Sequence, residues 1–486
     1  MKQDLAQLLN SPGALKGLGA KLRIVLLLTW PAVMAQMSNI VMEYIDASMV
    51  GSLGPVQSAA IGLVSTSTWL IWGLGIAAST GFAVQVAHRV GAGDDNGARK
   101  VTLAALGAVF AVGVLIGCIG VAISGRLPFW LGGSDEIAGP AGAYFGIFAA
   151  GMPLMSLTFL ATSLLRSSGN MTVPGIANVA MCAMDVLFNF LLIFPTREFA
   201  LGGLTLTVPG AGLGVAGAAL GTVLAYISGG AWLMWYVLRR SSHLRYPWRT
   251  TRDRRHCHIE KSVMTRAATI CWPVALERVV MCGAQILITT IVAPLGNAAI
   301  AANAFAVTAE SLCYAPGYGV GDAATTLVGQ SIGAGRKEMA LSFSRISVGA
   351  GMIIMGILGA VMWLLAPQMM SLFSSDTEIV SLGTMALRTE AWAEPMFAAA
   401  IVTYGVMVGA GYTIVPACIN FGCIWLVRLT LAAVLAPSMG LYGIWLAMCI
   451  ELCVRGAIFL ICLTRRRWLR HPHTTPPEVF EEEATL

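Results

Sequence analysis

Twelve long apolar segments constrain this chain more than any other feature of its sequence. An α-helix rises about 1.5 Å per residue, so about 20 apolar residues are enough to cross a bilayer. Only 11% of the 486 residues are charged, whereas soluble proteins carry about 25%. We therefore predict an all-α polytopic membrane protein with twelve transmembrane helices. The predicted spans are 22–50, 58–88, 101–124, 138–166, 173–194, 212–238, 264–292, 298–330, 342–366, 380–408, 414–436 and 440–464.

The second half of the sequence repeats the first. Trp30-Pro31 recurs as Trp272-Pro273, an offset of 242 (272 − 30), and Gly91-Ala92-Gly93 recurs as Gly333-Ala334-Gly335 at the same offset. Four further pairs share this offset: Leu53-Gly54 with Leu295-Gly296, Pro153 with Pro395, Gly169 with Gly411, and Pro174 with Pro416. Gly214 and Gly217 then match Gly440 and Gly443 at an offset of 226, so the first half holds about 16 extra residues near Arg197 to Pro209.

Each half contains six spans, so the two copies have the same orientation in the membrane. Parallel repeats of this kind are related by an axis along the membrane normal, and transporters bind their cargo near the midplane between such halves. We predict an N-lobe (1–238), a basic cytoplasmic linker (239–263), a C-lobe (264–465) and a disordered cytoplasmic tail (466–486).

The basic residues of the connections predict the orientation. Arginine and lysine gather in the segments after spans 2, 6, 8 and 12, whereas the alternate connections contribute little more than Arg126 and Arg197. Because cytoplasmic loops carry the excess of Lys and Arg, both termini should be cytoplasmic.

The first span carries a polar stripe. Gln36, Asn39, Glu43 and Asp46 are spaced by 3, 4 and 3 residues, which places them within a sector of about 80° on a helix. A charge near the middle of a span costs at least about 2.5–3.5 kcal/mol, so such side chains face protein or water. Alternatively, Glu43 and Asp46 mark the end of the span at the lipid headgroups.

The fifth span carries a second polar face, made of Asn178, Asp185 and Asn189. Asp185 lies roughly 16 Å along this span, near the midplane, where a headgroup location cannot explain it. It is either a functional acid or a structural one that joins two helices. The repeat places Ile288 at the position of Asp46 and Val427 at that of Asp185, which favours a site specific to the N-lobe.

The second half has charged residues of its own inside its spans. Glu277, Glu310 and Met281 are candidates for a substrate cavity, with functional and structural interpretations equally open for the two acids. Glu451 and Arg455 are four residues apart, which favours an intrahelical ion pair.

Several motifs together resemble one transporter family. Pro31 is followed fifteen residues later by Asp46 and then by Val50-Gly51. Further matches are QVAHRVGAG (85–93), LRSSGNMTVP (165–174) and WLVR (425–428). In order and spacing they resemble the multidrug and toxin extrusion (MATE) family of bacteria. The resemblance implies two six-helix lobes around a central cavity that opens alternately to either side. It also implies export of organic, often cationic, compounds driven by inward H⁺ or Na⁺.

The resemblance also extends to particular residues. Asp46 matches the family's acid in the first helix, whereas Asp185 and Asn189 stand in the reverse of the order usual for that helix in one branch. The acid of the sodium-driven branch is replaced by Met281. The cation-coupling candidates are Asp46, Asp185, Asn189, Asn178 and Glu43, and the substrate-cavity candidates are Gln36, Asn39, Glu277, Glu310 and Met281.

We expect a monomer in the bacterial inner membrane that meets lipid and small organic substrates, without nucleic acid and without a cofactor other than the coupling ion. The sequence lacks the HExxH motif, and no GxSxG nucleophile elbow between a strand and a helix is predicted in this all-α chain. The run His256-Cys257-His258 lies in a basic connection without a further Cys nearby, so no metal site is predicted. The alternative function is a flippase of lipid-linked oligosaccharides. Phosphate-bearing cargo calls for a cationic cavity, and the mid-span acids outnumber Arg278, Arg428 and Arg455.

Overall fold

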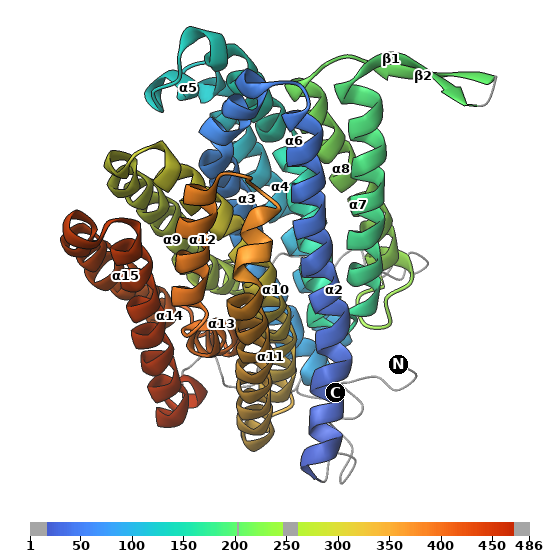
Figure 1. The fold of residues 1–486 in the computed structure, drawn as a ribbon. Coiled ribbons are helices and arrows are strands. Elements are labelled where there is room, and N and C mark those ends of the chain that lie inside the picture. The colour runs from blue at the N-terminus through green and yellow to red at the C-terminus, as the bar shows by residue number, and fades with distance from the viewer. Residues whose placement is uncertain (1–16, 202–203, 246–260, 471–486) are drawn as a thin grey trace, which may run out of the picture.

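The computed structural model describes residues 17–201, 204–245 and 261–470 (Figure 1). The predicted linker lies mostly outside the described residues, as does the predicted tail beyond residue 470. The six long helices of the N-lobe are α2 (Leu18–Gly51), α3 (Pro55–Gly91), α4 (Asp95–Ser124), α6 (Asp135–Ser167), α7 (Thr172–Ile193) and α8 (Val215–Arg239). The C-lobe contains α9 (Lys261–Val292), α10 (Asn297–Gly333), α11 (Lys337–Ser371), α12 (Thr377–Glu390), α13 (Glu394–Gly409), α14 (Ile414–Gly422), the π-helical turn η3 (Cys423–Arg428) and α15 (Leu429–Arg465).

The twelve predicted spans are confirmed as helices, although the tenth is bent and the last two lie in one helical segment. Within the described residues, ten helical segments are long and apolar enough to cross a membrane, and α12 with α13 forms an eleventh span that is bent by 60°. The 52-residue segment from Ile414 to Arg465 holds two spans, because Gly440 adopts φ 60° and turns the chain back. Short turns complete the fold: α5 (Leu127–Trp130), η2 (Ala293–Leu295) and η4 (Arg467–Arg470).

The extra residues of the first half form a β-hairpin, which the all-α prediction did not include. Strand β1 (Pro195–Leu201) pairs antiparallel with β2 (Leu204–Ala211), with Leu201 opposite Leu204 at the tip. The hairpin projects from one end of the bundle (Figure 1). We call this the hairpin end. The opposite end, where α2 begins at Leu18 and α3 and α10 finish at Gly91 and Gly333, is called the basal end.

The bend in the tenth span is a second departure from the prediction. Pro395 lies in the first turn of α13, where its missing N–H costs no hydrogen bond. Three residues, Ala391 to Ala393, separate α12 from α13. The equivalent proline of the first half, Pro153, lies inside the unbroken helix α6. The bend is therefore a feature of the C-lobe alone.

Glycines at equivalent positions of the two halves share the same backbone conformation, at both offsets of the repeat. Gly93 and Gly335, which are 242 residues apart, adopt φ 78° and 71°. Gly214 and Gly440, which are 226 residues apart, adopt φ 56° and 60°. Left-handed backbone of this kind favours glycine, and its recurrence at equivalent turns confirms that the lobes are copies.

The two lobes meet where α3 crosses α10. A Cβ atom on Gly91 would collide with the backbone of Gln330, and one on Gly333 would collide with the backbone of His88. The side chains on each side of this crossing bind the other lobe. His88 Nε2 donates to the carbonyl of Gly409 at 2.9 Å, and Gln330 Nε2 donates to that of Ser167 at 2.7 Å. The 242-residue offset converts one of these two contacts into the other, because Gln330 is the counterpart of His88 and Gly409 is the counterpart of Ser167. The crossing therefore lies on the pseudo-twofold axis.

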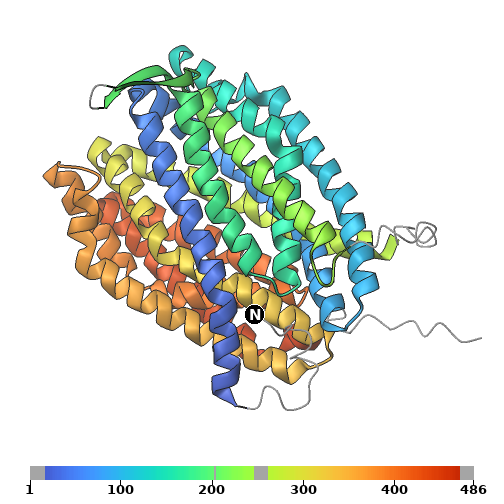
Figure 2. The ribbon, with the colours of Figure 1, turned by 90° about the vertical axis from the view of Figure 1, so that its right-hand side faces the viewer.

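Helix α2 contacts both lobes. Its basal half, including Val25 and Leu28, packs on Ala323 and Phe343 of the C-lobe. Its other half packs on α7 of the N-lobe. Figure 2 shows α2 running between the two lobes. Residues near the middle of α2 therefore lie where the lobes diverge.

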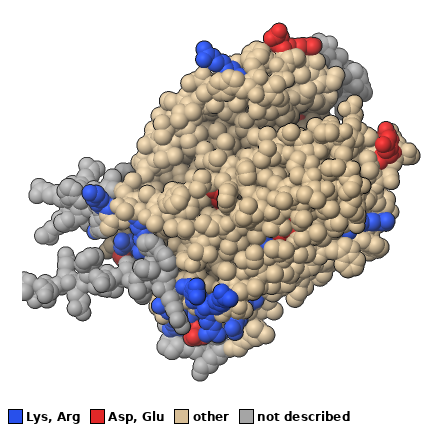
Figure 3. All heavy atoms as spheres, turned by 90° about the vertical axis from the view of Figure 1, so that its left-hand side faces the viewer, with Lys and Arg blue, Asp and Glu red and all other residues tan. Residues whose placement is uncertain are grey.

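Most of the surface drawn in Figure 3 lacks charged side chains, and Lys and Arg gather in its lower part. Apolar side chains with exposed fractions above one half project from several helices, including Leu115, Ile353 and Leu364. A surface of this kind suits contact with lipid tails rather than with water.

Candidate functional site

The interior of the N-lobe holds two carboxyls bridged by one amide. Asn189 Nδ2 donates to Asp46 Oδ1 at 2.6 Å and to Asp185 Oδ2 at 3.1 Å. Asp46 comes from α2, and the other two residues come from adjacent turns of α7. The sequence predicted a shared polar face for each helix, and the structure turns the two faces toward one another.

Helix α8 closes this site from behind. Asp185 and Asn189 have no exposed surface, and Asp46 is half-buried. A Cβ atom on Gly221 of α8 would collide with Asn189 Oδ1, so only glycine leaves room for the amide there. Asp185 Oδ1 and Asn189 Oδ1 accept no hydrogen bond from the described residues. The site thus keeps acceptor capacity for a proton or a small cation.

The remaining coupling candidates lie outside Asp46, Asp185 and Asn189, which we call the trio. Asn178 is buried on the same face of α7, about two turns toward the basal end, and makes no hydrogen bond to the trio. Glu43 is exposed and faces a cavity between the lobes. The polar residues of α2 therefore lie in two different environments: Asp46 belongs to the trio, and Glu43 faces the cavity.

A cavity of two adjoining chambers lies between the lobes. The basal chamber has a volume of about 210 Å³ and the outer chamber about 430 Å³. Both contact Arg278, Met281 and Tyr318 of the C-lobe and Ile76 of α3. The described residues that line the chambers include none of the trio, Asp46, Asp185 and Asn189. The cavity and the N-lobe site are thus separate places.

The lining of the cavity is almost balanced in charge. It contains five carboxyl residues and four arginines: Glu43, Glu277, Glu310, Asp322 and Glu390, with Arg166, Arg278, Arg428 and Arg455. Apolar and aromatic side chains, including Trp69 and Trp72, make up much of the rest. Such a lining suits amphiphilic organic molecules that carry a charge.

The substrate-cavity candidates are distributed unevenly. Met281 lines both chambers, Glu277 the basal one and Glu310 the outer one. Gln36 instead bonds a side chain of the C-lobe, and Asn39 is half-buried without lining either chamber.

Glu277 is held by neutral partners. Asn420 Nδ2 donates to its Oε1 at 2.6 Å, and the hydroxyl of Tyr404 donates to its other oxygen. Asn420 is the repeat counterpart of Asn178, so the two lobes use equivalent amides differently. The predicted ion pair between Glu451 and Arg455 is also present, with Oε1 and Nε 2.9 Å apart.

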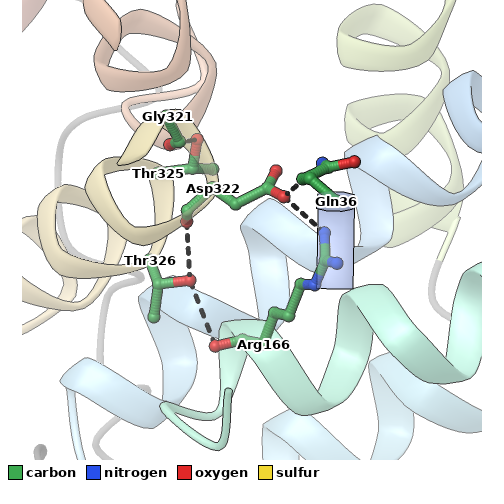
Figure 4. Close-up of polar contacts among 6 residues, drawn as sticks. All are labelled: Gln36, Arg166, Gly321, Asp322, Thr325 and Thr326. Atoms are coloured by element: carbon green, nitrogen blue, oxygen red, sulfur yellow. Dashed lines mark hydrogen bonds and ion pairs between the residues drawn. The ribbon is translucent and has the colours of Figure 1, made fainter. Parts of the chain in front are cut away.

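Sequence reasoning missed the ion pair that links the lobes. Arg166 Nη1, from the basal end of α6, contacts Asp322 Oδ2 of α10 at 2.5 Å. Gln36 Nε2 donates to the same oxygen at 3.2 Å. Figure 4 shows the three side chains converging from α2, α6 and α10. Asp322 lies eleven residues before the end of a long apolar helix. A charge at that depth is costly unless it has a partner, so the sequence could have marked Asp322 as a candidate functional residue.

Contacts between the lobes gather toward the basal end. Besides the pairs at the α3–α10 crossing, Thr326 Oγ1 donates to the carbonyl of Arg166 at 3.1 Å, and Lys21 Nζ donates to Ser342 Oγ at 2.9 Å. In the other half the hydroxyl of Tyr44 donates to the carbonyl of Thr308 at 2.9 Å. Most of the described polar contacts between the lobes thus lie on the basal side of the cavity.

Comparison with known proteins agrees on one family. The family model described as MatE matches residues 31–191 and 273–434, once in each lobe. A probable multidrug resistance protein NorM of Thermotoga maritima is 23% identical over 93% of this chain and 94% of its own length. A protein of the same description from Pseudomonas syringae is 24% identical over 89% and 92%.

Solved structures share the fold at low sequence identity. A MOP superfamily transporter from Pyrococcus furiosus superposes with a TM-score of 0.84 at 20% identity, over 95% of this chain and 97% of that one. The Vibrio cholerae MATE transporter VcmN in its bent form superposes with a TM-score of 0.80 at 18% identity, over 93% and 98%.

Proposed function

This chain belongs to the MatE family of transporters, and we propose that it exports organic cations across the bacterial inner membrane in exchange for an inward coupling ion. The observation that carries the proposal is the pair of carboxyls bridged by Asn189, placed inside one lobe and away from the cavity. A coupling ion and a cargo molecule would then have separate sites whose occupancy each biases the same lobe arrangement. The relatives described as multidrug resistance proteins support the class of cargo.

We propose H⁺ as the coupling ion. Two carboxyls that share one amide donor cannot both carry a full charge at low cost, and one proton between them relieves the repulsion. The position at which the sodium-driven branch has an acid holds Met281 instead. One proton taken up from outside would favour the arrangement that releases cargo, since a ligand shifts an equilibrium only through different affinities for the two states.

We propose that the basal end faces the cytoplasm, because its connections carry most of the Lys and Arg. The structure then corresponds to an outward-facing arrangement, closed on the cytoplasmic side. One chain supplies both lobes and the whole cavity, so the working unit is proposed to be a monomer.

The test uses the purified protein in proteoliposomes with a fluorescent organic cation as cargo. A pH gradient alone is expected to drive its movement, whereas a Na⁺ gradient alone at equal pH is expected to leave it at the level of protein-free vesicles. Transport under the Na⁺ gradient alone would replace H⁺ by Na⁺ in the proposal, and movement under neither gradient would refute it.

A second candidate function is the transport of lipid-linked sugars, favoured by the four arginines that line the cavity. Its cargo carries phosphate groups, which arginine binds well. A diphosphate lipid that competes with the organic cation for binding at equal ionic strength would favour this second function. If the lipid does not change the binding of the organic cation, the second function is excluded.

A further inference from the structure

The ion pair between Arg166 and Asp322 crosses from one lobe to the other inside the cavity. We propose that Asp322 is a binding subsite for the positive charge of the cargo, and that Arg166 occupies this subsite in place of the cargo while the basal side is closed. This inference rests on the proposed export of organic cations, which it extends by naming a carboxyl that receives them.

The carboxyl of Asp322 is only partly committed to its protein partners. Arg166 and Gln36 both bond Oδ2, whereas Oδ1 accepts no hydrogen bond from the described residues. The side chain retains 32% of its surface exposed and lines the basal chamber together with Arg166 (Figure 4). A ligand in the chamber can therefore reach Asp322 directly.

The ion pair depends on the arrangement of the lobes. Arg166 lies at the end of α6, and Thr326 of α10 holds the carbonyl of the same residue at 3.1 Å. Movement of the lobes apart at the basal end would separate the guanidinium from the carboxyl. The carboxylate of Asp322, freed from its guanidinium partner, would then attract a cation. Closure would return Arg166 and displace it.

The repeat argues against a purely architectural pair. The counterparts of Arg166 and Asp322 in the other half are Val408 and Thr80, at the offset of 242. Both counterparts line the same basal chamber. The symmetry-related position in the chamber therefore carries no charge. An ion pair that only held the lobes together would be equally useful at that position, so its absence there favours a specific role for Asp322.

The other acid of the basal chamber is already satisfied within its own lobe. Glu277 accepts hydrogen bonds from Asn420 and Tyr404, and both partners move with it. A change in the lobe arrangement leaves those bonds intact. Asp322 is therefore the carboxyl of this chamber whose availability changes with the transport cycle.

The test measures equilibrium binding to the purified full-length protein in detergent, without any ion gradient. The probe is tetraphenylphosphonium, and the neutral triphenylphosphine oxide serves as its uncharged counterpart. Arg166→Gln is expected to tighten binding of the cation about tenfold, because the competing guanidinium is gone. The double variant Arg166→Gln/Asp322→Asn should lose that gain, and the neutral probe should bind each variant equally.

A matched control removes a different basal contact between the lobes. Lys21→Gln breaks the bond to Ser342, which lies outside both chambers, and should leave binding of the cation unchanged. If Lys21→Gln gives the same gain as Arg166→Gln, the effect is a general loosening of the lobes and the proposal fails. It also fails if the double variant binds as tightly as Arg166→Gln.

If the melting temperature shows that Arg166→Gln does not fold, two further variants test the subsite at Asp322. Asp322→Glu keeps the charge and should retain binding of the cation, whereas Asp322→Asn should weaken it. Equal binding by both would overturn the subsite. Because no gradient is used, wild-type transport with unchanged binding by the Asp322 variants would reject this inference alone and leave the proposed export standing.

Discussion

At the scale of single residues, one amide organises the N-lobe site. An asparagine side chain has two N–H donors and one carbonyl acceptor. Asn189 spends its donors on Asp46 and Asp185, and its carbonyl points to the space left by Gly221. The amide thereby fixes the separation of two carboxyls that come from different helices.

The first prediction concerns Asp46. Asp46→Asn keeps the size of the side chain but removes its titratable charge, so it should resemble a permanently protonated site. Transport of an organic cation driven by a pH gradient should fall about tenfold or more, since the coupling energy is lost. Asp185→Asn should act in the same way, because the same amide bridges the two carboxyls.

The control for this prediction is Asp135→Asn, the same chemical change at an exposed acid in the first turn of α6. It should transport at the wild-type rate when expression and melting temperature match. Ile288, the repeat counterpart of Asp46, is unsuitable for this purpose, because it is 3% exposed in the apolar core of the C-lobe. Wild-type transport by well-folded Asp46→Asn would contradict the proposed coupling site.

At the scale of elements, the two lobes differ by a few local irregularities placed on a shared plan. In the described part of the chain, only the C-lobe has the bend between α12 and α13 and the π-helical turn at Cys423–Arg428. The N-lobe alone has the β-hairpin. Irregular turns inside membrane helices are tolerated where protein surrounds them and often mark functional positions. The turn carries Arg428, which lines the outer chamber.

The second prediction is that the β-hairpin is dispensable. The C-lobe makes the equivalent connection without it and reaches Gly440 with the same backbone conformation as Gly214. Replacing residues 198–208 by a short Gly-Ser linker should change the melting temperature little and leave gradient-driven transport intact. A loss of transport by a folded variant of this kind would give the hairpin a function that the repeat does not suggest.

At the scale of the whole molecule, the lobes are joined at the basal end and separated by the cavity. The α3–α10 crossing relies on contacts so close that side chains larger than glycine at positions 91 and 333 would collide with the opposite backbone. Opening of the cavity at the basal end, which the proposed export requires, would have to separate the close contacts of this crossing.

The third prediction tests the orientation. In a variant whose native cysteines are replaced, a cysteine introduced at Arg239, at the basal end of α8, should react with an impermeant maleimide only after the cells are permeabilised. Position 239 is exposed at the end of that helix. A cysteine at Asp135, near the hairpin end, should react in intact cells. The reverse pattern would invert the proposed orientation.

Much of this architecture could be predicted from the sequence. The twelve spans follow from apolar length, since a bilayer admits few structures other than helices whose backbone bonds are satisfied internally. The two lobes follow from anchors such as Trp30-Pro31 and Trp272-Pro273. The polar faces of Asp46 and Asp185 were visible from helical spacing, because periodicity along one helix is a local property.

Only the tertiary structure decided which polar groups meet. Helical spacing says where Gln36 points on α2, but not that an acid 286 residues later accepts its hydrogen bond. The pairing of Arg166 with Asp322 depends on how two lobes cross, and that crossing is set by the packing of glycines against distant backbone. The bend before Pro395 was also invisible, since Pro153 at the equivalent position leaves its helix unbroken. Contacts across lobes are non-local, so the sequence determined the parts and their packing determined the site.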